Sequence, residues 1–263
     1  MGLILNTFAT MNFYKLLLSF LLLGIMNNAF TQVSVKDSIV FAPIIDFTYS
    51  YKAPGGDMEK RFGNHSEIGL AFLIKTKKNF FYGIDWNYMF GSTVNELGFT
   101  DGFRDANGGI LAVNGLYSEV YFTERGFTLS ARFGQMFNLL AANPNSGVVL
   151  MGGIGFLQHR IKIEDKFNEV PLLSGDDYST GYDRLSNGIL FTEFVGYRLL
   201  SSRRLINLFG GFEFTQGLTK NRRSVNFDTG TRDTKQRLDL TMGFRVGFSL
   251  PLYKPTPKEF YYR

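Results

Sequence analysis

The stretch 237–253 near the end of the chain constrains the fold most, because its apolar residues recur at every second position. Successive side chains of a strand point to opposite faces, so one face here is apolar while the other carries small and polar residues, including Asp239 and Arg245. The alternation runs about three times the usual strand length of roughly 5–6 residues. A long strand with an apolar exterior and a charged interior is typical of a closed barrel in lipid.

The composition agrees with a barrel. The chain has 28 Phe, 13 Tyr and 29 Gly, which suits aromatic girdles at the membrane interfaces and a crowded interior. It has no Cys, which excludes a disulfide framework, a thiolate metal site and a lipoprotein anchor. No run after residue 32 approaches the roughly 20 apolar residues of a spanning helix.

The N-terminus has the pattern of a signal peptide. A basic start ending at Lys15 precedes the apolar run 16–25, and small residues at Ala29 and Thr31 then predict cleavage before Gln32. Met11 fits the true start better than Met1. The alternative is a transmembrane anchor, for which the run is too short. Cleavage lowers the net charge from +5 to +4, because it removes Lys15 and no acid.

Alternating segments separated by Gly, Asn, Pro and charged clusters predict an all-β protein, an antiparallel up-and-down transmembrane barrel with long outer loops and short periplasmic turns. A ninth candidate, 117–124, conflicts with the even strand number of bacterial barrels. We interpret it as an extension of the fourth strand above the membrane or a short helix, which leaves eight strands. The expected strands are 39–51, 66–75, 79–91, 127–137, 147–163, 187–200, 205–219 and 237–253.

Two residues oppose this scheme. Glu193 and Gln135 fall on the outward-facing parity of their strands. A β-bulge that shifts the register would explain them, as would a position near the membrane interface.

Charged residues on the inward parity are expected to meet inside the barrel. An eight-stranded barrel is just wide enough for side chains to fill. We therefore favour a lumen plug of ion pairs over a proton path, an ion path or a gate. The residues of this lumen network are Asp46, Asp85, Arg132, Arg198, Glu213, Asp239 and Arg245.

The sequence predicts neither a catalytic site nor a cofactor. His65 and His159 are the only histidines, and neither has a metal-ligand spacing to other candidate ligands. Ser130 and Ser249 are on the inward parity, but no His stands in a demonstrable relation to either. We expect a protein that is not an enzyme and has no metal site, with pH sensing by His159 as a further alternative.

Two outer loops carry opposite charge. Residues 164–184 have a net charge of −4 and include Asp176 and Asp177, whereas residues 220–237 have a net charge of +4 and include Arg222 and Arg223. Two explanations fit this charge pattern equally well: ordinary charged loops exposed to solvent, and a binding surface. Outside a cell, lipopolysaccharide phosphates or an acidic protein are better targets for the basic loop than nucleic acid. We hypothesise that the loops, neighbours in the eight-strand order, attract each other into a lid.

A motif in the last strand adds a resemblance. Arg245-x-Gly247-x-x-Leu250-x-Leu252 resembles the C-terminal signal read by the insertion machinery of bacterial outer-membrane barrels, although residues 254–263 follow it as a short periplasmic tail. With its signal peptide and strands, the chain is similar to the small eight-stranded barrels of the OmpA-barrel and OmpX kind. Four further stretches resemble an uncharacterised barrel family of Bacteroidota: 143–147, 156–159, 181–185 and 211–217. The resemblance implies a Gram-negative outer-membrane location, and it fixes no activity.

The domain organisation expected is a signal peptide over 1–31, a barrel over 32–253 and the tail. The function favoured is a non-enzymatic outer-membrane barrel with a filled lumen, in a structural or accessory role that presents its outer loops to a partner. The alternative is a porin-like, narrow transport barrel for small solutes or apolar molecules, similar to the OmpW family.

Overall fold

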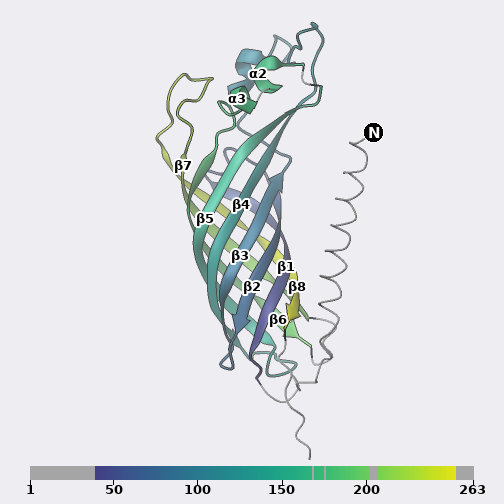
Figure 1. Ribbon diagram of the computed structural model, residues 1–263, viewed down its shortest axis with the longest axis vertical. Coiled ribbons are helices and arrows are strands. Elements are labelled where there is room, and N and C mark those ends of the chain that lie inside the picture. The colour runs from purple at the N-terminus through teal and green to yellow at the C-terminus, as the bar shows by residue number, and fades with distance from the viewer. Residues whose placement is uncertain (1–38, 168, 175, 202–206, 253–263) are drawn as a thin grey trace, which may run out of the picture. The chain divides into compact units, whose positions relative to one another are not determined.

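The computed structural model describes residues 39–252, except 168, 175 and 202–206, and leaves out the side chains of 172, 174, 176 and 177. The signal peptide and tail expected from the sequence lie outside the described residues. Eight antiparallel strands follow one another around a closed barrel (Figure 1). Their bounds are β1 Ala42–Gly56, β2 His65–Lys75, β3 Phe80–Gly91, β4 Val120–Phe137, β5 Gly147–Asp165, β6 Ser186–Leu200, β7 Asn207–Asn221 and β8 Gln236–Pro251.

The barrel closes through β1 and β8, which pair over their whole common length, with Asp46 opposite Ser249. The expected eight-stranded, up-and-down architecture is confirmed. The ambiguous segment 117–124 largely joins β4, which begins at Val120 and pairs with β5 as far as Asp165. This hairpin extends well beyond the shorter strands β2 and β3, and it carries the outer loops away from the barrel (Figure 1).

Short helices occur in two of the outer loops. The 3₁₀ helix η1, Gly98–Phe103, lies between β3 and β4, while α2, Pro171–Ser174, and α3, Asp176–Ser179, lie between β5 and β6. None of the helices in the described part of the chain is long and apolar enough to cross a membrane.

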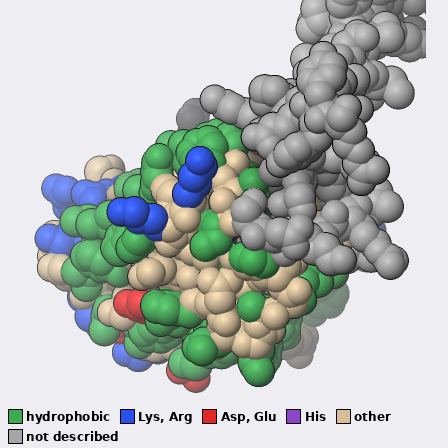
Figure 2. All heavy atoms as spheres, turned by 90° about the horizontal axis from the view of Figure 1, so that it is seen from below, with side chains coloured by type: hydrophobic (Ala, Val, Ile, Leu, Met, Phe, Trp, Pro, Cys, Tyr) green, Lys and Arg blue, Asp and Glu red, His purple; other side chains and the backbone are tan. Residues whose placement is uncertain are grey.

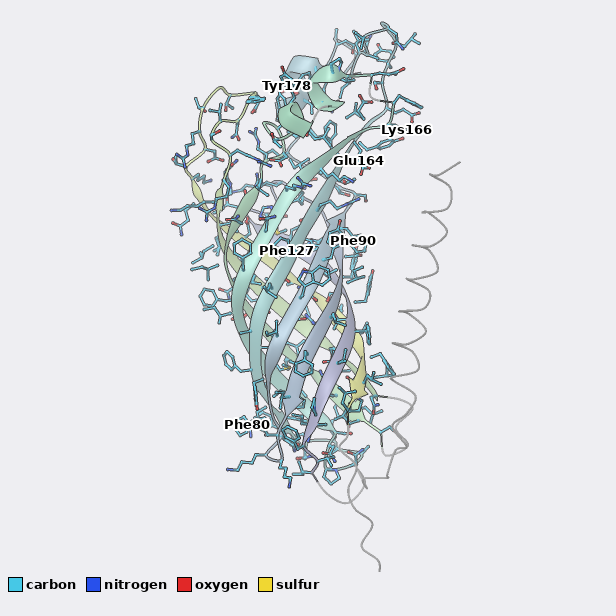
Figure 3. All side chains as sticks on the ribbon, in the orientation of Figure 1. Phe80, Phe90, Phe127, Glu164, Lys166 and Tyr178 are labelled. Atoms are coloured by element: carbon cyan, nitrogen blue, oxygen red, sulfur yellow. The ribbon has the colours of Figure 1, made fainter. Side chains whose placement is uncertain are left out.

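Apolar side chains cover the outside of the barrel. Outward positions of β1 to β3 carry exposed Phe, Tyr, Ile, Leu and Trp side chains, for example Tyr49, Leu70 and Trp86, each about half exposed. Seen from below, hydrophobic side chains gather around the rim of the barrel (Figure 2). The belt extends from Phe80 near the short-turn end to Phe90 and Phe127, below the outer end of the molecule, where Glu164 of β5 and the loop residues Lys166 and Tyr178 lie (Figure 3). In a closed barrel such a surface faces lipid.

Glu193 and Gln135 lie on this outer surface without any bulge. The pairing of β6 with β5 and β7 continues without interruption through Glu193, and Gln135 pairs with Phe80 and Leu150 in an equally regular ladder. The bulge suggested by the sequence is therefore wrong, because no extra residue is inserted in either strand. Glu193 is exposed, and Gln135 is partly buried near the short turns.

Side chains fill the interior in layers. An apolar cluster closes the end with the short turns and consists of Ala42, Ile44, Ala71, Leu73, Phe81, Met136, Val149 and Leu200. A second cluster lies beneath the outer loops and consists of Met58, Phe62, Met89, Val94, Phe99, Leu157, Ile161 and Leu190. The charged residues of the lumen occupy the space between these layers.

Candidate functional site: the filled lumen and the outer loops

The middle of the lumen holds a cluster with equal numbers of cations and anions. Arg132 binds Asp85 through Nε at 3.0 Å and Nη2 at 2.7 Å, and it also binds Glu213. Arg245 binds the same two carboxylates, at 2.8 Å to Asp85 and 3.2 Å to Glu213. Lys52 Nζ bridges two carboxylates, since it lies 2.9 Å from Glu213 and 2.8 Å from Glu67. We call these six residues, Lys52, Glu67, Asp85, Arg132, Glu213 and Arg245, the central cluster.

Every member of the central cluster is at least 94% buried. Buried charges are tolerated when they are paired and hydrogen-bonded, and leaving one unpaired costs several kcal/mol. Because three cations face three anions that share contacts, the cluster is neutral as a whole.

A separate ion pair lies nearer the short turns. Arg198 binds Asp46 in a two-pronged contact at 2.9 and 2.6 Å, and Ser249 bonds to both. The Arg198 guanidinium also stacks over Phe209, 4.4 Å from the ring centroid. Gly247 lies under this ring, and a Cβ there would come within 2.4 Å of it.

The two histidines lie in the upper part of the lumen. His159 Nε2 is 2.9 Å from Asp239, which also accepts a bond from Thr219. His65 lies between two carboxylates, 3.7 Å from Glu67 and 3.6 Å from Glu124. All these side chains are buried. Across the residues that the structure describes, no group of three or more His, Asp and Glu is arranged to hold a metal ion.

The packing leaves little empty space in the lumen. The cavity between the Arg198 pair and the central cluster has a volume of about 20 Å³. A water molecule needs at least about 10–15 Å³ of such volume, so this space holds about one. Together with the apolar layers above and below, the ion pairs fill the interior of the described barrel with side chains.

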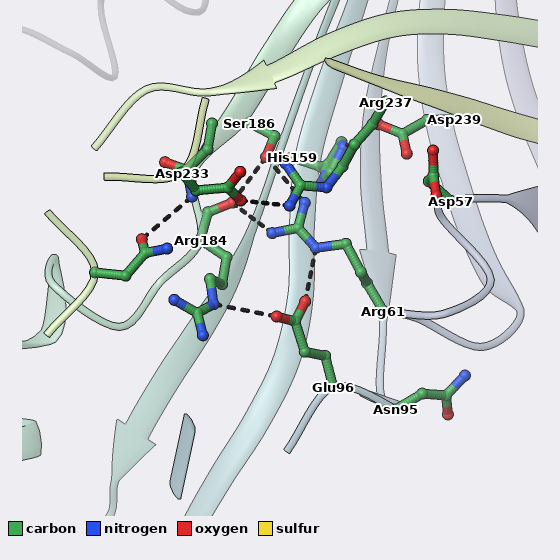
Figure 4. Close-up of polar contacts among 12 residues, drawn as sticks. Asp57, Arg61, Asn95, Glu96, His159, Arg184, Ser186, Asp233, Arg237 and Asp239 are labelled. Carbon is green, nitrogen blue, oxygen red and sulfur yellow. Dashed lines mark hydrogen bonds and ion pairs between the residues drawn. The ribbon is translucent and has the colours of Figure 1, made fainter. Parts of the chain in front are cut away.

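The four outer loops are joined by four residues, one from each, which we call the latch: Arg61, Glu96, Arg184 and Asp228. Arg61 Nε donates to Glu96 at 2.9 Å, and Arg184 Nε donates to the other oxygen of Glu96 at 3.2 Å (Figure 4). Arg184 also forms a two-pronged pair with Asp228 at 2.9 and 2.6 Å.

The environment of the latch keeps its arginines in place. Arg61 also donates to the backbone oxygen of Arg184 at 3.1 Å and to Ser186 at 2.9 Å. Burial acts to lower the pKa of Arg184, but the carboxylates of Asp228 and Glu96 outweigh it and raise the pKa above its usual value. The guanidinium of Arg184 is therefore held as a cation between two anions.

The acidic and basic loops contact each other directly. Arg223 binds Asp183 through Nε at 2.8 Å and Nη2 at 2.5 Å, and Phe227 packs edge-on against Tyr182. Arg222, in contrast, is exposed and donates to Asn187. The side chains of Asp176 and Asp177 lie outside the described residues. The loops thus meet through Asp183 and through the Arg184–Asp228 pair of the latch, rather than through a described contact of the two acids that the sequence singled out.

The loop between β3 and β4 presents an apolar tip to solvent. Val113 is 76% exposed and Leu116 is 67% exposed, with Leu111 and Tyr117 beside them. The tip is tied down, since the N–H of Val113 donates to Glu169 O at 3.0 Å and Tyr117 Oη donates to Asp105 at 2.7 Å. Exposed apolar groups on an ordered loop are typical of a contact surface.

The residues of the insertion signal divide between the inner and the outer face of the barrel, with Leu252 directly after the end of β8. Arg245 and Gly247 point into the lumen, where they contact the central cluster and Phe209, whereas Leu250 and Leu252 are 44% and 45% exposed outside. Each residue of this motif thus also has a place in the folded barrel.

Sequence reasoning left out part of the polar network, including Lys52 and Glu67 of the central cluster. Lys52 is on the inward parity of β1, one residue beyond the strand expected from the sequence, whereas Glu67 lies within the expected second strand on its inward parity and was not included. Glu124, like Lys52, follows from the extension of its strand, β4. The latch residues lie in irregular loops without periodicity, and only their charges hint at pairing.

A closed antiparallel barrel with an apolar exterior and a charged interior is the architecture of bacterial outer-membrane proteins. The fold is that of an eight-stranded outer-membrane barrel. No family model matches the chain, and no curated protein matches it either.

Solved structures of outer-membrane barrels share the fold at low similarity. Ail, the attachment invasion locus protein of Yersinia pestis, has 9% identity and a TM-score of 0.44, covering 80% of this chain and 98% of its own. Neisserial surface protein A has 11% identity and a TM-score of 0.37, covering 78% and 96%. OprG from Pseudomonas aeruginosa has 11% identity and a TM-score of 0.34, covering 82% and 98%.

Proposed function

We propose that this outer-membrane barrel is a non-enzymatic, non-conducting protein that holds an ordered set of outer loops against a partner outside the cell. The latch is the observation that carries this proposal, because it joins one residue of every outer loop in a single chain of contacts. Loops fixed in this way lose little conformational entropy on binding, which favours recognition by a preorganised surface.

The filled lumen supports the same role. Two apolar layers and the central cluster take up the space in which a solute would move. The alternative is a narrow transport barrel, which requires these side chains to rearrange.

Conductance of the purified protein in planar lipid bilayers separates the two functions. A filled lumen gives no steady openings, whereas a transport barrel for ions or small polar solutes gives defined conductance levels. The Arg184→Ala variant, which breaks the latch, tests whether the loops alone close the barrel. We expect no conductance from this variant either, because the packed layers below the loops are unchanged. Steady openings of the wild-type protein would contradict the proposal.

The partner is expected at the apolar tip of the loop between β3 and β4. Val113 and Leu116 provide apolar contact area, and the exposed Lys220 and Arg232 beside the other loops are available to lipopolysaccharide phosphates or an acidic protein. Wild type in nanodiscs and a Val113→Ser, Leu116→Ser variant are compared for binding to an array of extracellular proteins. A protein that recognises this surface should bind the wild type and should not bind the variant. Equal binding to both would show that the apolar tip is not the binding site.

A further inference from the structure

One carboxylate lies on the lipid-facing side of the barrel. Glu193 is the only acidic residue at an outward strand position within the apolar belt of the described residues. Along β6 it follows Ile189 and Phe191, which are 54% and 40% exposed, and precedes Val195, which is 48% exposed. Since apolar outward residues lie on both sides of it, Glu193 is in the middle of the belt rather than at an interface.

The pairing with the neighbouring strands also places Glu193 in the middle of the belt. Glu193 is directly opposite Gly152 of β5 and Phe214 of β7. The polar outward residues that mark the outer limit of the belt on these strands are further away, at Gln158, Asn187 and Lys220. A charge or acid on the lipid face of a barrel is unfavourable near the midplane, and intramembrane ionisable residues generally have a partner.

Within one chain Glu193 has a weak partner. The Nε2 of Gln216 lies 3.3 and 3.4 Å from the two carboxyl oxygens, and it is the only hydrogen-bond partner of Glu193 among the described side chains. A primary amide has two N–H donors and one carbonyl acceptor. Both N–H groups cannot be well satisfied by one carboxyl group at this distance, and the amide carbonyl faces the same apolar surroundings.

The surface is hollowed next to this polar pair. A groove with a volume of about 430 Å³ runs along the outside of β4 to β7, between Phe133, Leu150, Val195 and Phe212. Gly152 forms part of its floor opposite Glu193, where any side chain would approach the Phe133 ring at 3.3 Å. Small residues beside a polar pair allow two membrane surfaces to approach closely.

We propose that this face, centred on Glu193 and Gln216, binds a second copy of the same chain in the membrane. Two barrels inserted in the same direction form a twofold pair about an axis along the membrane normal, which places groups of equal height opposite each other. The amide of Gln216 and the carboxyl group of Glu193 lie at nearly the same height, because their polar atoms are only 3.3–3.4 Å apart. Gln216 of each copy then donates its second N–H to Glu193 of the other.

The self-complementary chemistry favours a second copy over other occupants. The patch presents an acceptor and a donor side by side, so its own twofold image satisfies both, whereas lipid chains satisfy neither.

The absence of Cys makes crosslinking a direct test. Val195→Cys places a thiol one outward position from Glu193, and Ile84→Cys, on β3, places an equally outward thiol on a distant face as a matched control. Both proteins are refolded into phosphatidylcholine vesicles at a low protein-to-lipid ratio and treated with a short bismaleimide. We expect a dimer from Val195→Cys in clear excess over Ile84→Cys.

Two further variants identify the contact. Glu193→Leu with Gln216→Leu, in the Val195→Cys background, should fold normally and lower the dimer yield about tenfold, because interfacial hydrogen bonds in membranes are lost. Glu193→Gln keeps a hydrogen-bonding group and should retain the dimer. Heat-modifiable mobility on gels confirms that each variant is folded.

Three results would overturn the proposal: equal crosslinking of the Val195 and Ile84 thiols, a dimer yield unaffected by the double Leu variant, or a strictly monomeric wild type in vesicles. If the thiol of Val195→Cys is crosslinked in whole outer membranes only to a different protein, that protein replaces the second copy as the occupant.

Discussion

The lumen and the outer loops use the same ion-pair chemistry in opposite surroundings. Side chains of the central cluster are at most 6% exposed, and each carboxylate forms an ion pair with at least one Arg or Lys. Outer pairs such as Lys60 with Asp57 and Lys166 with Glu119 have side chains up to 71% exposed. The latch lies between these extremes, with Arg184 at 7% and Glu96 at 33% exposed.

This difference predicts what each pair does. In water-exposed pairs, attraction is offset by hydration, side-chain entropy and salt, so the net contribution is roughly 0–1 kcal/mol. In the lumen, a charge without its partner cannot return to water, and the loss is far larger. The lumen pairs therefore fix the barrel interior, whereas the loop pairs set the arrangement of a surface.

The largest effect is expected at the centre of the lumen. Arg132→Ala leaves Asp85 and Glu213 with one cation fewer, which should cost about 3–5 kcal/mol of unfolding free energy. Urea unfolding of the refolded protein in lipid vesicles measures it. Lys166→Ala, which breaks an exposed pair, is the control and should leave the midpoint unchanged. Equal midpoints for both variants would remove the distinction between the two regions.

A smaller net effect is expected when both members of a lumen pair are replaced together. Arg198→Met alone leaves Asp46 as an unpaired buried charge. Arg198→Met combined with Asp46→Leu removes both charges, so the free energy of unfolding should recover to within about 1–2 kcal/mol of wild type. The remainder reflects Ser249 and the lost stacking on Phe209. A double variant as unstable as the single one would show that the pair stabilises by more than mutual neutralisation.

The sequence specified the lumen better than the loops, for a physical reason. Alternation assigns every strand residue to one of two faces, so the inward position of Asp85, Glu213 and Arg245 follows from parity alone. Which of these residues meet depends on the strand tilt and register, and Arg132 with Glu213 joins strands that are not neighbours.

Loop contacts have no comparable rule. Opposite net charge indicated that the loops after β5 and β7 attract, but Asp183 with Arg223 and Arg184 with Asp228 could not be selected from among many charges. Glu193 is a different case. Its outward position follows from the alternation, although an acid at an outward position conflicts with a lipid-facing surface.

An effect of about 1–3 kcal/mol is expected from overpacking at the lower end of the lumen. A Cβ at Gly247 would lie 2.4 Å from the Phe209 ring and 2.7 Å from Phe47 O, so Gly247→Ala forces a shift. Gly210→Ala is the matched control, since its Cβ meets Val246 at 3.4 Å. Urea unfolding of refolded protein separates this packing effect from recognition by the insertion machinery. Equal losses in both variants would contradict the packing argument.

A local effect is expected at the latch. Arg184→Gln removes the cation between Glu96 and Asp228, and we expect about 1 kcal/mol of local stability to be lost, near the upper range for partly exposed pairs. Hydrogen exchange of the outer loops should accelerate about fivefold, while exchange in the strands stays unchanged. Arg160→Gln, which affects only a 3.8 Å contact to Asp183, is the control. Faster exchange confined to the loop that carries Arg184 would show that the four loops are not coupled.

The smallest effect is a pH dependence at the outer end of β1. A hydrogen bond from Lys60, followed by one from the backbone N–H of Leu238, lowers the pKa of Asp57 from 3.8 to about 2. Because the folded pKa is below the unfolded one, the stabilisation is fully present above about pH 4 and is lost as the pH falls towards 2. Exchange in residues 57–64, corrected for intrinsic rates, should rise between pH 5 and pH 3 in wild type. It should stay flat in Asp57→Asn, which carries no titrating group there, and a rise of equal size in this variant would assign the pH effect to another group.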